Sequence, residues 1–240
     1  EGEWFSAIFN TGQVLRHSIA TTGGSYQSED QVFLSSDIPD FHPTDVLQDG
    51  NGDLLVVVTG GWFIKGCPLS RVAKPDVPGG VFRIKKTGTP DLEDPWGTSI
   101  AFDQKTPQEL ITLLDDKRPM VRRNALENLV STGPGSLEVL RGRYQNGTDP
   151  QRLEILYAIH RLHTEEGKAL VREALSDDFE DIRIAGARLC GLSKDEKALS
   201  TLLDIVRSDS SIRVRRQAAT ALGQIGSEDA VPGLVEASIG

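Results

Sequence analysis

The chain has 240 residues, of which 38% are hydrophobic and 25% charged, a composition typical of globular proteins. Its net charge is −9, and residues 1–100 carry 7 Lys and Arg against 13 Asp and Glu, while the remainder carries 19 against 22. Neither half is basic, which argues against a nucleic-acid-binding surface. No apolar run reaches the ~18 residues that a membrane-spanning helix needs. Because residue 1 is Glu rather than Met, we expect the chain to be an excised part of a longer protein.

The first forty residues favour short strands. Residues 4–9 and 13–19 are predicted to be strands joined by a tight turn at 10–12. Residues 21–30 are rich in Gly and Ser and are predicted to form a loop, with another short strand at 31–34.

Residues 41–86 give the clearest signal for a sheet. Strands are predicted at Thr44–Leu47, Leu54–Thr59 and Gly80–Lys86, and the first two flank the turn Asp49–Asp53. Asn-Gly between two apolar runs is a strong hairpin signal, since both turn positions favour positive φ. Both faces of the second strand are apolar, so we expect it to be covered on both sides, as in stacked blades of a β-propeller. Residues 87–103 contain two prolines and no clear period, and we expect a linker there.

From residue 106 the sequence repeats itself at a nearly fixed period. Five leucines recur at steps of 30, 30, 32 and 32 residues, namely Leu110, Leu140, Leu170, Leu202 and Leu234. Four arginines recur at steps of 30, 31 and 32 residues, namely Arg122, Arg152, Arg183 and Arg215. An Asp or Asn stands six residues before each arginine, namely Asp116, Asn146, Asp177 and Asp209. Self-similarity of this kind indicates a solenoid in which stacked neighbours complete the core.

Each unit is predicted to contain an A helix with the leucine, a polar turn, and a B helix that opens near the arginine. Apolar residues at helical spacing place the B helices near 119–130, 150–162, 180–192 and 212–225. A fifth A helix is predicted at 230–238, with Val231, Leu234 and Val235 exposed because no next repeat covers them. We therefore predict about four helix pairs plus one helix over residues 106–240.

This half resembles HEAT repeats, in the short form also seen in phycobilisome-lyase-like proteins. VRRQAATALGQIG at 214–226 is close to the B-helix consensus of that family, and the Asp-to-Arg spacing also matches. The resemblance implies a polar ladder in which Asp116, Asp177 and Asp209 accept hydrogen bonds from the backbone and from the arginines. Asn146 would make a weaker link, and Gln151 replaces an apolar residue, so the second repeat departs most from the pattern. Asp195 is expected on a surface turn outside the ladder.

Residues 1–88 resemble a different family. FHPTDVLQDGNGDLLVVVTGGWF and GCPLSRVAKPDVPGGVFRI are similar to the last blade of the six-bladed propeller of bacterial membrane-bound dehydrogenase-like proteins of planctomycete and verrucomicrobial type. That propeller is similar to pyrroloquinoline-quinone-dependent glucose and sorbosone dehydrogenases. In that family a HEAT array follows the propeller and a c-type cytochrome often follows the array. The resemblance implies a partial β-propeller of one to two blades over 1–88, a linker over 89–105, and an extracytoplasmic, periplasmic location.

His42 and Asp45 are the only catalytic candidates that this reading offers. They open a strand that would line the channel of a propeller, where they could form a base and its orienting partner or contact a cofactor. The alternative is that they cap strand ends by hydrogen bonds. Asp49, Asn51 and Asp53 match the opening of a calcium loop, but Leu54 and Gly60 break its later positions, so a hairpin turn is favoured.

The cysteines and histidines have mainly structural interpretations. Cys67 lies among Trp62, Lys65, Arg71 and Lys74, whose cations would lower the pKa of the thiol, although packing is an equal alternative. Cys190 is predicted on the apolar face of a B helix, in the core of the array. His160 and His163 lie near the end of a B helix, where cations suit the helix dipole, and further metal ligands are not visible.

Two classes of function follow from these patterns. The first is a fragment of a propeller oxidoreductase for sugars or alcohols, with pyrroloquinoline quinone only in the longer parent, no cofactor in this fragment, and a HEAT array that holds a protein partner such as a cytochrome. The second is a binding scaffold without catalysis, and a less favoured third is a bilin lyase-like HEAT protein.

Overall fold

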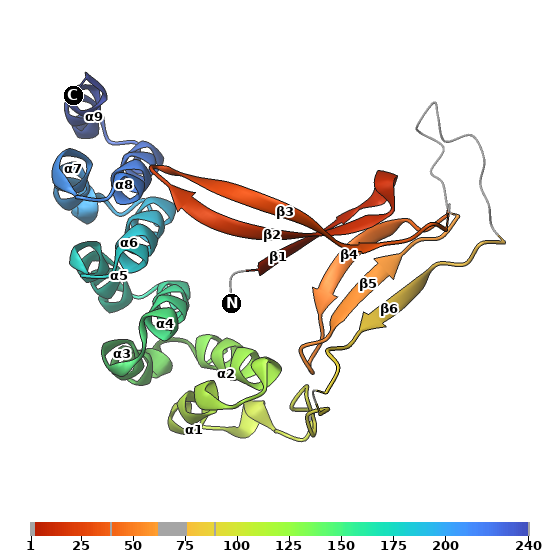
Figure 1. Cartoon of the computed structure of the whole chain (residues 1–240). Coiled ribbons are helices and arrows are strands. Elements are labelled where there is room, and N and C mark those ends of the chain that lie inside the picture. Colours follow the sequence, from red (N-terminus) through yellow and green to blue (C-terminus); the bar gives the residue numbers. More distant parts are fainter. Residues whose placement is uncertain (1–2, 39, 62–75, 89, 240) are drawn as a thin grey trace. The chain divides into compact units, whose positions relative to one another are not determined.

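The computed structural model describes residues 3–38, 40–61, 76–88 and 90–239. These residues form two compact units, a β unit made mostly of residues up to 98 and a helical unit made mostly of residues from 99 onward. No helix in the described ranges is both long and apolar enough to cross a bilayer. The mixed β and α class expected from the sequence is confirmed, and Figure 1 shows the order of the elements.

The first sheet of the β unit contains β1 (Glu3–Ile8), β2 (Gln13–Thr22) and β3 (Ser25–Ser35), in the order β1-β2-β3. β1 and β2 pair antiparallel, with Ser6 opposite Leu15 and Trp4 opposite His17. A single 3-10 turn joins them and ends at Gly12, whose φ of 63° suits a residue without a Cβ. The two strands predicted in this region are therefore confirmed.

The loop predicted at residues 21–30 is wrong. β2 continues to Thr22 and β3 starts at Ser25, so the two strands form the long ribbon seen in Figure 1. Almost every residue of this ribbon beyond His17 is exposed. The ribbon therefore has no buried face, and its sequence lacks the alternation of apolar and polar residues by which a strand is recognised. The turn itself is confined to Gly23 and Gly24, and the threonines and Tyr26 around it have β-forming side chains.

The second sheet contains β4 (Pro43–Gln48), β5 (Leu54–Val58) and β6 (Gly80–Ile84), in the order β4-β5-β6. β4 and β5 pair antiparallel across the predicted hairpin, and no helix interrupts this region. The turn differs from the expected one, because only Gly52 has a positive φ, of 86°. Its N–H donates to the Asp49 carbonyl at 3.0 Å, which is the three-residue hairpin loop that ends in a left-handed glycine.

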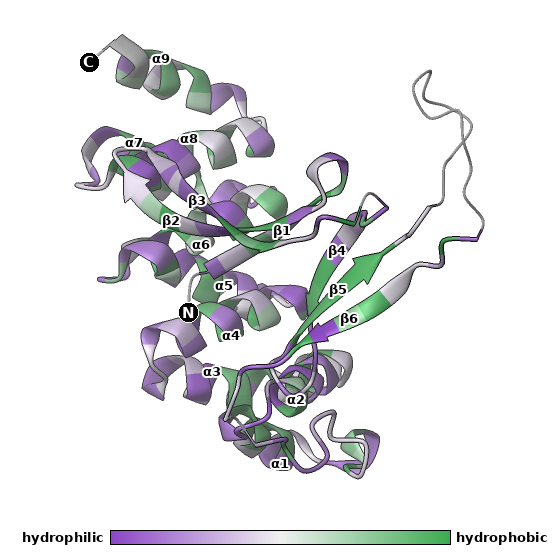
Figure 2. Ribbon diagram, turned by 45° about the vertical axis from the view of Figure 1, so that its right-hand side comes forward, coloured by the Kyte–Doolittle hydropathy of each residue, from purple (hydrophilic) through white to green (hydrophobic). Residues whose placement is uncertain are grey.

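One small core holds the two sheets together. Val14 of the first sheet and Val56 and Val58 of the second are buried, and Phe5 and Ile84 pack against them. The opposite face of β5 is only half-buried at Leu55 and Val57, so the expectation that both faces are covered is not met. Figure 2 shows the apolar colour concentrated on β5. Each sheet in the described residues is open and three-stranded, and neither closes into a propeller.

The helical unit consists of helix pairs in two layers (Figure 1). The A layer contains α1 (Pro107–Thr112), α3 (Leu137–Asn146), α5 (Glu165–Glu173), α7 (Leu199–Ser208) and α9 (Val231–Ile239). The B layer contains α2 (Pro119–Ser131), α4 (Asp149–Arg161), α6 (Glu180–Leu192) and α8 (Ile212–Ile225). The four B helices predicted from periodicity are confirmed to within one residue at each end.

The repeated leucines form the spine of a single core that runs through the array. Leu110, Leu140, Leu170 and Leu202 are each at most 2% exposed, and Leu234 packs against the same cluster from α9. Val231 and Val235 are 54% and 53% exposed, as expected for the last helix. Leu234 was expected to be exposed and is half-buried instead, because α9 packs on α7 and turns this residue inward.

Candidate functional site

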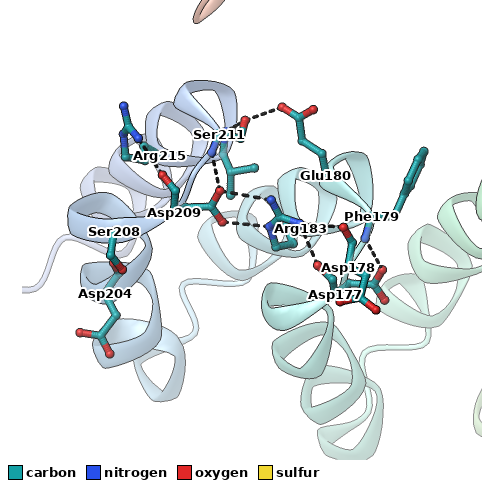
Figure 3. Close-up of polar contacts among 11 residues, drawn as sticks. Asp177, Asp178, Phe179, Glu180, Arg183, Asp204, Ser208, Asp209, Ser211 and Arg215 are labelled. Carbon is teal, nitrogen blue, oxygen red and sulfur yellow. Dashed lines mark hydrogen bonds and ion pairs between the residues drawn. The ribbon is translucent and has the colours of Figure 1, made fainter.

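The arginines and aspartates predicted as a ladder lie at the joints between repeats. Arg183 of α6 donates to both carboxylate oxygens of Asp209 in the next repeat, at 2.9 and 3.2 Å. It also donates to the backbone carbonyl of Asp177 in its own repeat, at 2.9 Å. Arg152 reaches one carboxylate oxygen of Asp177 in the next repeat, and its second hydrogen bond goes to the side chain of Asp149 at 3.1 Å. We call each such Arg–Asp pair between repeats a rung, and Figure 3 shows the contacts around Arg183 and Asp209. The guanidinium of Arg183 thus links the turn at Asp177 in its own repeat to the turn at Asp209 in the next repeat.

The electrostatics of the rung favour the charged pair. The side chain of Asp209 is 9% exposed, so burial alone would raise the pKa of its carboxyl. The hydrogen bonds from Arg183 and from the Ser211 backbone outweigh burial and lower that pKa. Asp209 therefore stays ionised and orders the first turn of α8.

The contact expected between the first two repeats, from Arg122 to Asn146, is missing, and the position of Asn146 explains why. Arg122 and Arg215 each donate at 2.7 Å to the carbonyl six residues before them, in Asp116 and Asp209. Asn146 is the last residue of α3, and its amide donates back to Gly142 at 2.8 Å. In the other three repeats the equivalent Asp follows the helical segment as its C-cap. The side chain of Asn146 therefore points into its own helix end.

The second repeat replaces the lost link with other contacts. Gln151 accepts from the Thr148 backbone at 3.0 Å in a capping box at the start of α4. It also donates to Asp115 of the preceding repeat at 3.3 Å, and Arg143 pairs with the same carboxylate. Gln151 therefore departs from the apolar pattern because it serves as a cap and a cross-link.

Asp195 was expected on a surface turn, and this expectation is wrong. Its side chain is 7% exposed and pairs with Arg172 of α5. It also accepts from the Lys197 backbone at 3.1 Å and so caps a short 3-10 turn before α7. Asp195 is thus a second kind of inter-helix link that the repeat pattern did not reveal.

His42 and Asp45 are not brought together as a catalytic pair. The ring of His42 stacks on Phe9 at 4.5 Å, and its Nδ1 donates weakly to the Phe9 carbonyl at 3.4 Å. Asp45 accepts from the adjacent Val46 backbone at 2.8 Å. These contacts support the start of β4, next to His42 and around Asp45.

Asp49, Asn51 and Asp53 form the hairpin turn rather than a calcium loop. Asp49 accepts from the backbone of Asn51 and Asp53 at 2.9 and 3.0 Å, and its other oxygen pairs with Arg83. Asn51 accepts from the Leu92 backbone at 3.0 Å. The acceptor oxygens are thus occupied by the protein itself. Over the described ranges, no group of three or more His, Cys, Asp and Glu side chains could hold a metal ion.

His160 and Cys190 both lie in the helical unit, and burial changes the pKa of each. Burial, with a smaller contribution from His163, lowers the pKa of His160, and its Nδ1 lies 3.2 Å from Ser193 Oγ. His160 is therefore neutral near pH 7 and does not act as the cation proposed for the helix end. Cys190 is confirmed in the core, where burial raises the pKa of its thiol to about 12. Cys67 lies outside the described residues.

The structure assembles one constellation that the sequence did not predict. On the first sheet His17 Nε2 lies 2.7 Å from Ser6 Oγ, and His17 Nδ1 lies 2.8 Å from Asp30 Oδ1. The carboxylate can only accept, so the Nδ1 proton lies toward Asp30, and Ser6 Oγ lies within hydrogen-bond distance of Nε2. Hydrogen bonds from Ser28 and His17 hold the pKa of Asp30 below its usual value. The residues come from three adjacent strands, and only the register of the sheet shows that they meet.

These distances are those of a nucleophile, a base and an orienting acid, yet the surroundings do not support catalysis. The side chain of Asp30 is 53% exposed, so water competes for its hydrogen bonds. A cavity of about 300 Å³ in the described part of the β unit is lined by residues such as Trp4, Val46 and Leu54, and not by these three side chains. The constellation therefore has a structural role, which is to tie β3 through β2 to β1.

One comparison with known protein families completes the description of the array. Residues 168–238, from within α5 to α9, match the family model of HEAT repeats. The HEAT part of the resemblance is thereby confirmed for the last two helix pairs and the helix that follows them.

Proposed function

We propose that this chain is a protein-binding scaffold whose helical array holds a partner. The observation that carries the proposal is the match of residues 168–238 to HEAT repeats, which commonly mediate protein interactions. The rungs Arg152–Asp177 and Arg183–Asp209 tie neighbouring repeats together from α4 onward, which supports a continuous surface along these helices.

Affinity capture with the whole chain from cells that produce it, followed by chemical crosslinking and mass spectrometry, tests the scaffold. We expect a stoichiometric partner with crosslinks to residues 99–240. A partner crosslinked only to residues 1–98, or no partner at all, would contradict the proposal.

A finer proposal is that the scaffold belongs to an oxidoreductase of the dehydrogenase-like kind. It is favoured by the antiparallel β4-β5-β6 meander at the stretch that resembles a propeller blade. In this proposal the longer parent is extracytoplasmic and holds pyrroloquinoline quinone on parts of the propeller outside this chain, and the array holds an electron-accepting partner such as a cytochrome. Titrating the longer parent with the quinone, aldoses and a dye acceptor tests it, and absence of both quinone binding and turnover would refute it.

A further inference from the structure

The B helices carry cations of only one type. Within α2, α4, α6 and α8 there are nine arginines and no lysine. Most are held by the rungs and pairs described above or by similar contacts, such as the bidentate pair of Arg161 with Glu127 at 2.9 and 2.7 Å. Arg123, Arg188 and Arg216 differ, because all three are exposed and none of their guanidinium groups makes a hydrogen bond or ion pair within the described part of the chain. Of these, Arg188 and Arg216 lie on the neighbouring helices α6 and α8.

Exposed apolar side chains occur at related positions on the same and neighbouring B helices. Tyr157 on α4 and Arg188 on α6 occupy equivalent positions, five residues after the ladder arginines of their repeats. Leu192 lies one turn beyond Arg188, and Arg216 lies on α8, which packs against α6. Tyr157 is 38% exposed and Leu192 54% exposed. We call these four residues the arginine strip.

The charge on the two helices that carry Arg188 and Arg216 is mainly positive, although an exposed Glu154 lies three residues before Tyr157 on α4. α8 contains no Asp or Glu, and α6 has none after Asp181 in its first turn. The array as a whole carries more acidic than basic residues, so this local excess of positive charge is an exception. An arginine matches a carboxylate with two parallel hydrogen bonds, and Tyr and Arg are common among residues that dominate binding energy.

We propose that the arginine strip binds an acidic, extended segment of a partner protein. Carboxylates of the segment would pair with Arg188 and Arg216, and one apolar side chain would contact Leu192 and Tyr157. This inference rests on the scaffold function proposed above and specifies the chemistry of its partner. Complementary charge commits the strip to an acidic occupant, because a neutral or basic segment would leave two exposed guanidinium groups without counter-charge.

A phage-displayed library of random 12-residue peptides, selected on the whole chain, provides the test. We expect the enriched peptides to combine Asp or Glu with an aliphatic or aromatic residue. Synthetic copies should bind at least ~10-fold more weakly to the double variant R188E/R216E, since the variant loses the charged hydrogen bonds to the peptide and places like charges against it. Their affinity should also fall as salt is raised.

The control is R141E/R207E, which makes the same change of charge on arginines of α3 and α7 in the A layer that are 40% and 45% exposed and pair with Glu138 and Glu236. It should leave peptide binding unchanged. Because Arg188 and Arg216 have no partner within the described residues, circular dichroism should show that R188E/R216E is folded. The variant L192S leaves both charges in place and should also weaken peptide binding.

Each outcome decides the inference. Enriched peptides that bind R188E/R216E as well as the original chain would overturn the arginine strip and leave the scaffold function intact. A library without any enriched peptide would count against both. A dimer of this chain that R188E/R216E dissociates, seen by light scattering, would assign the strip to a second copy and overturn the acidic segment.

Discussion

Asp177 and Asp195 each join two helices of different repeats through one arginine, although only Asp177 belongs to the repeated pattern. The side chains of Arg152 and Arg172 are 21% and 22% exposed, so removing either carboxylate leaves a partly buried guanidinium without its acceptor in the other repeat, although Arg152 keeps Asp149 in its own. Asp177→Ala and Asp195→Ala should each lower the free energy of unfolding by about 2–3 kcal/mol, measured by urea unfolding.

The control for this pair is Asp204→Ala, since that side chain is 77% exposed. Its effect should stay below ~0.5 kcal/mol. A control that destabilises as much as Asp177→Ala would show that the ladder adds nothing specific.

His160 gives the array a dependence on pH. Burial lowers its pKa in the folded state, so the unfolded state binds the proton more tightly. The stabilisation is complete above the unfolded pKa of ~6.5 and is lost as the pH falls through the lower folded value. The original chain should therefore lose more stability between pH 7.5 and 5 than His160→Gln does. Equal losses, measured by urea midpoints, would contradict this assignment.

Asn146→Asp is a substitution for which the sequence pattern and the observed geometry predict opposite effects on stability. The pattern suggests that an aspartate here would complete the missing rung. In the structure the side chain faces the Gly142 carbonyl at the C-terminal end of α3, where a negative charge meets the negative end of the helix dipole. We expect a loss of about 0.3–1 kcal/mol rather than a gain. A rise in the thermal midpoint would mean that the side chain turns toward Arg122.

At the scale of the element, two glycines in adjacent B helices have opposite environments. A Cβ at Gly191 of α6 would lie 2.8 Å from Ala221 Cα, because α6 and α8 approach closely there. A Cβ at Gly223 of α8 would meet nothing within 4 Å. Gly223→Ala should stabilise the array by about 0.5–1 kcal/mol through helix propensity, and Gly191→Ala should destabilise it by about 1–3 kcal/mol through overpacking. Thermal unfolding followed at 222 nm measures both, and equal effects would refute the close packing.

The B helices could be predicted almost residue by residue, whereas the ribbon of β2 and β3 could not. The core residues of successive helix pairs recur at a nearly fixed spacing, as Leu140 and Leu170 do. Each repeat therefore shows the same pattern of apolar residues again. The ribbon is exposed on both faces, so its sequence has no alternation between apolar and polar residues. Contacts such as His17 with Asp30 and Arg172 with Asp195 depend on register and packing, which spacing along one chain does not encode.

At the scale of the whole molecule, the two units can be observed separately. All three tryptophans, at positions 4, 62 and 96, precede the helical array in the sequence. Tryptophan fluorescence therefore reports the β unit, while the far-ultraviolet circular dichroism is dominated by the helices. Asp177→Ala should shift the urea midpoint seen at 222 nm and leave the fluorescence midpoint in place. Equal shifts of both midpoints would show that the two units unfold as one cooperative body.

The use of arginine alone in the B layer has a practical consequence for attaching the protein to a surface. All lysines of the array, at 105, 117, 168, 194 and 197, lie outside the four B helices. Reagents that acylate amines, including the esters used for biotinylation and for coupling to sensor chips, would therefore modify the array only on A helices and connecting turns. An array coupled through these amines would present its arginine-bearing helices to the solution, with their chemistry unaltered.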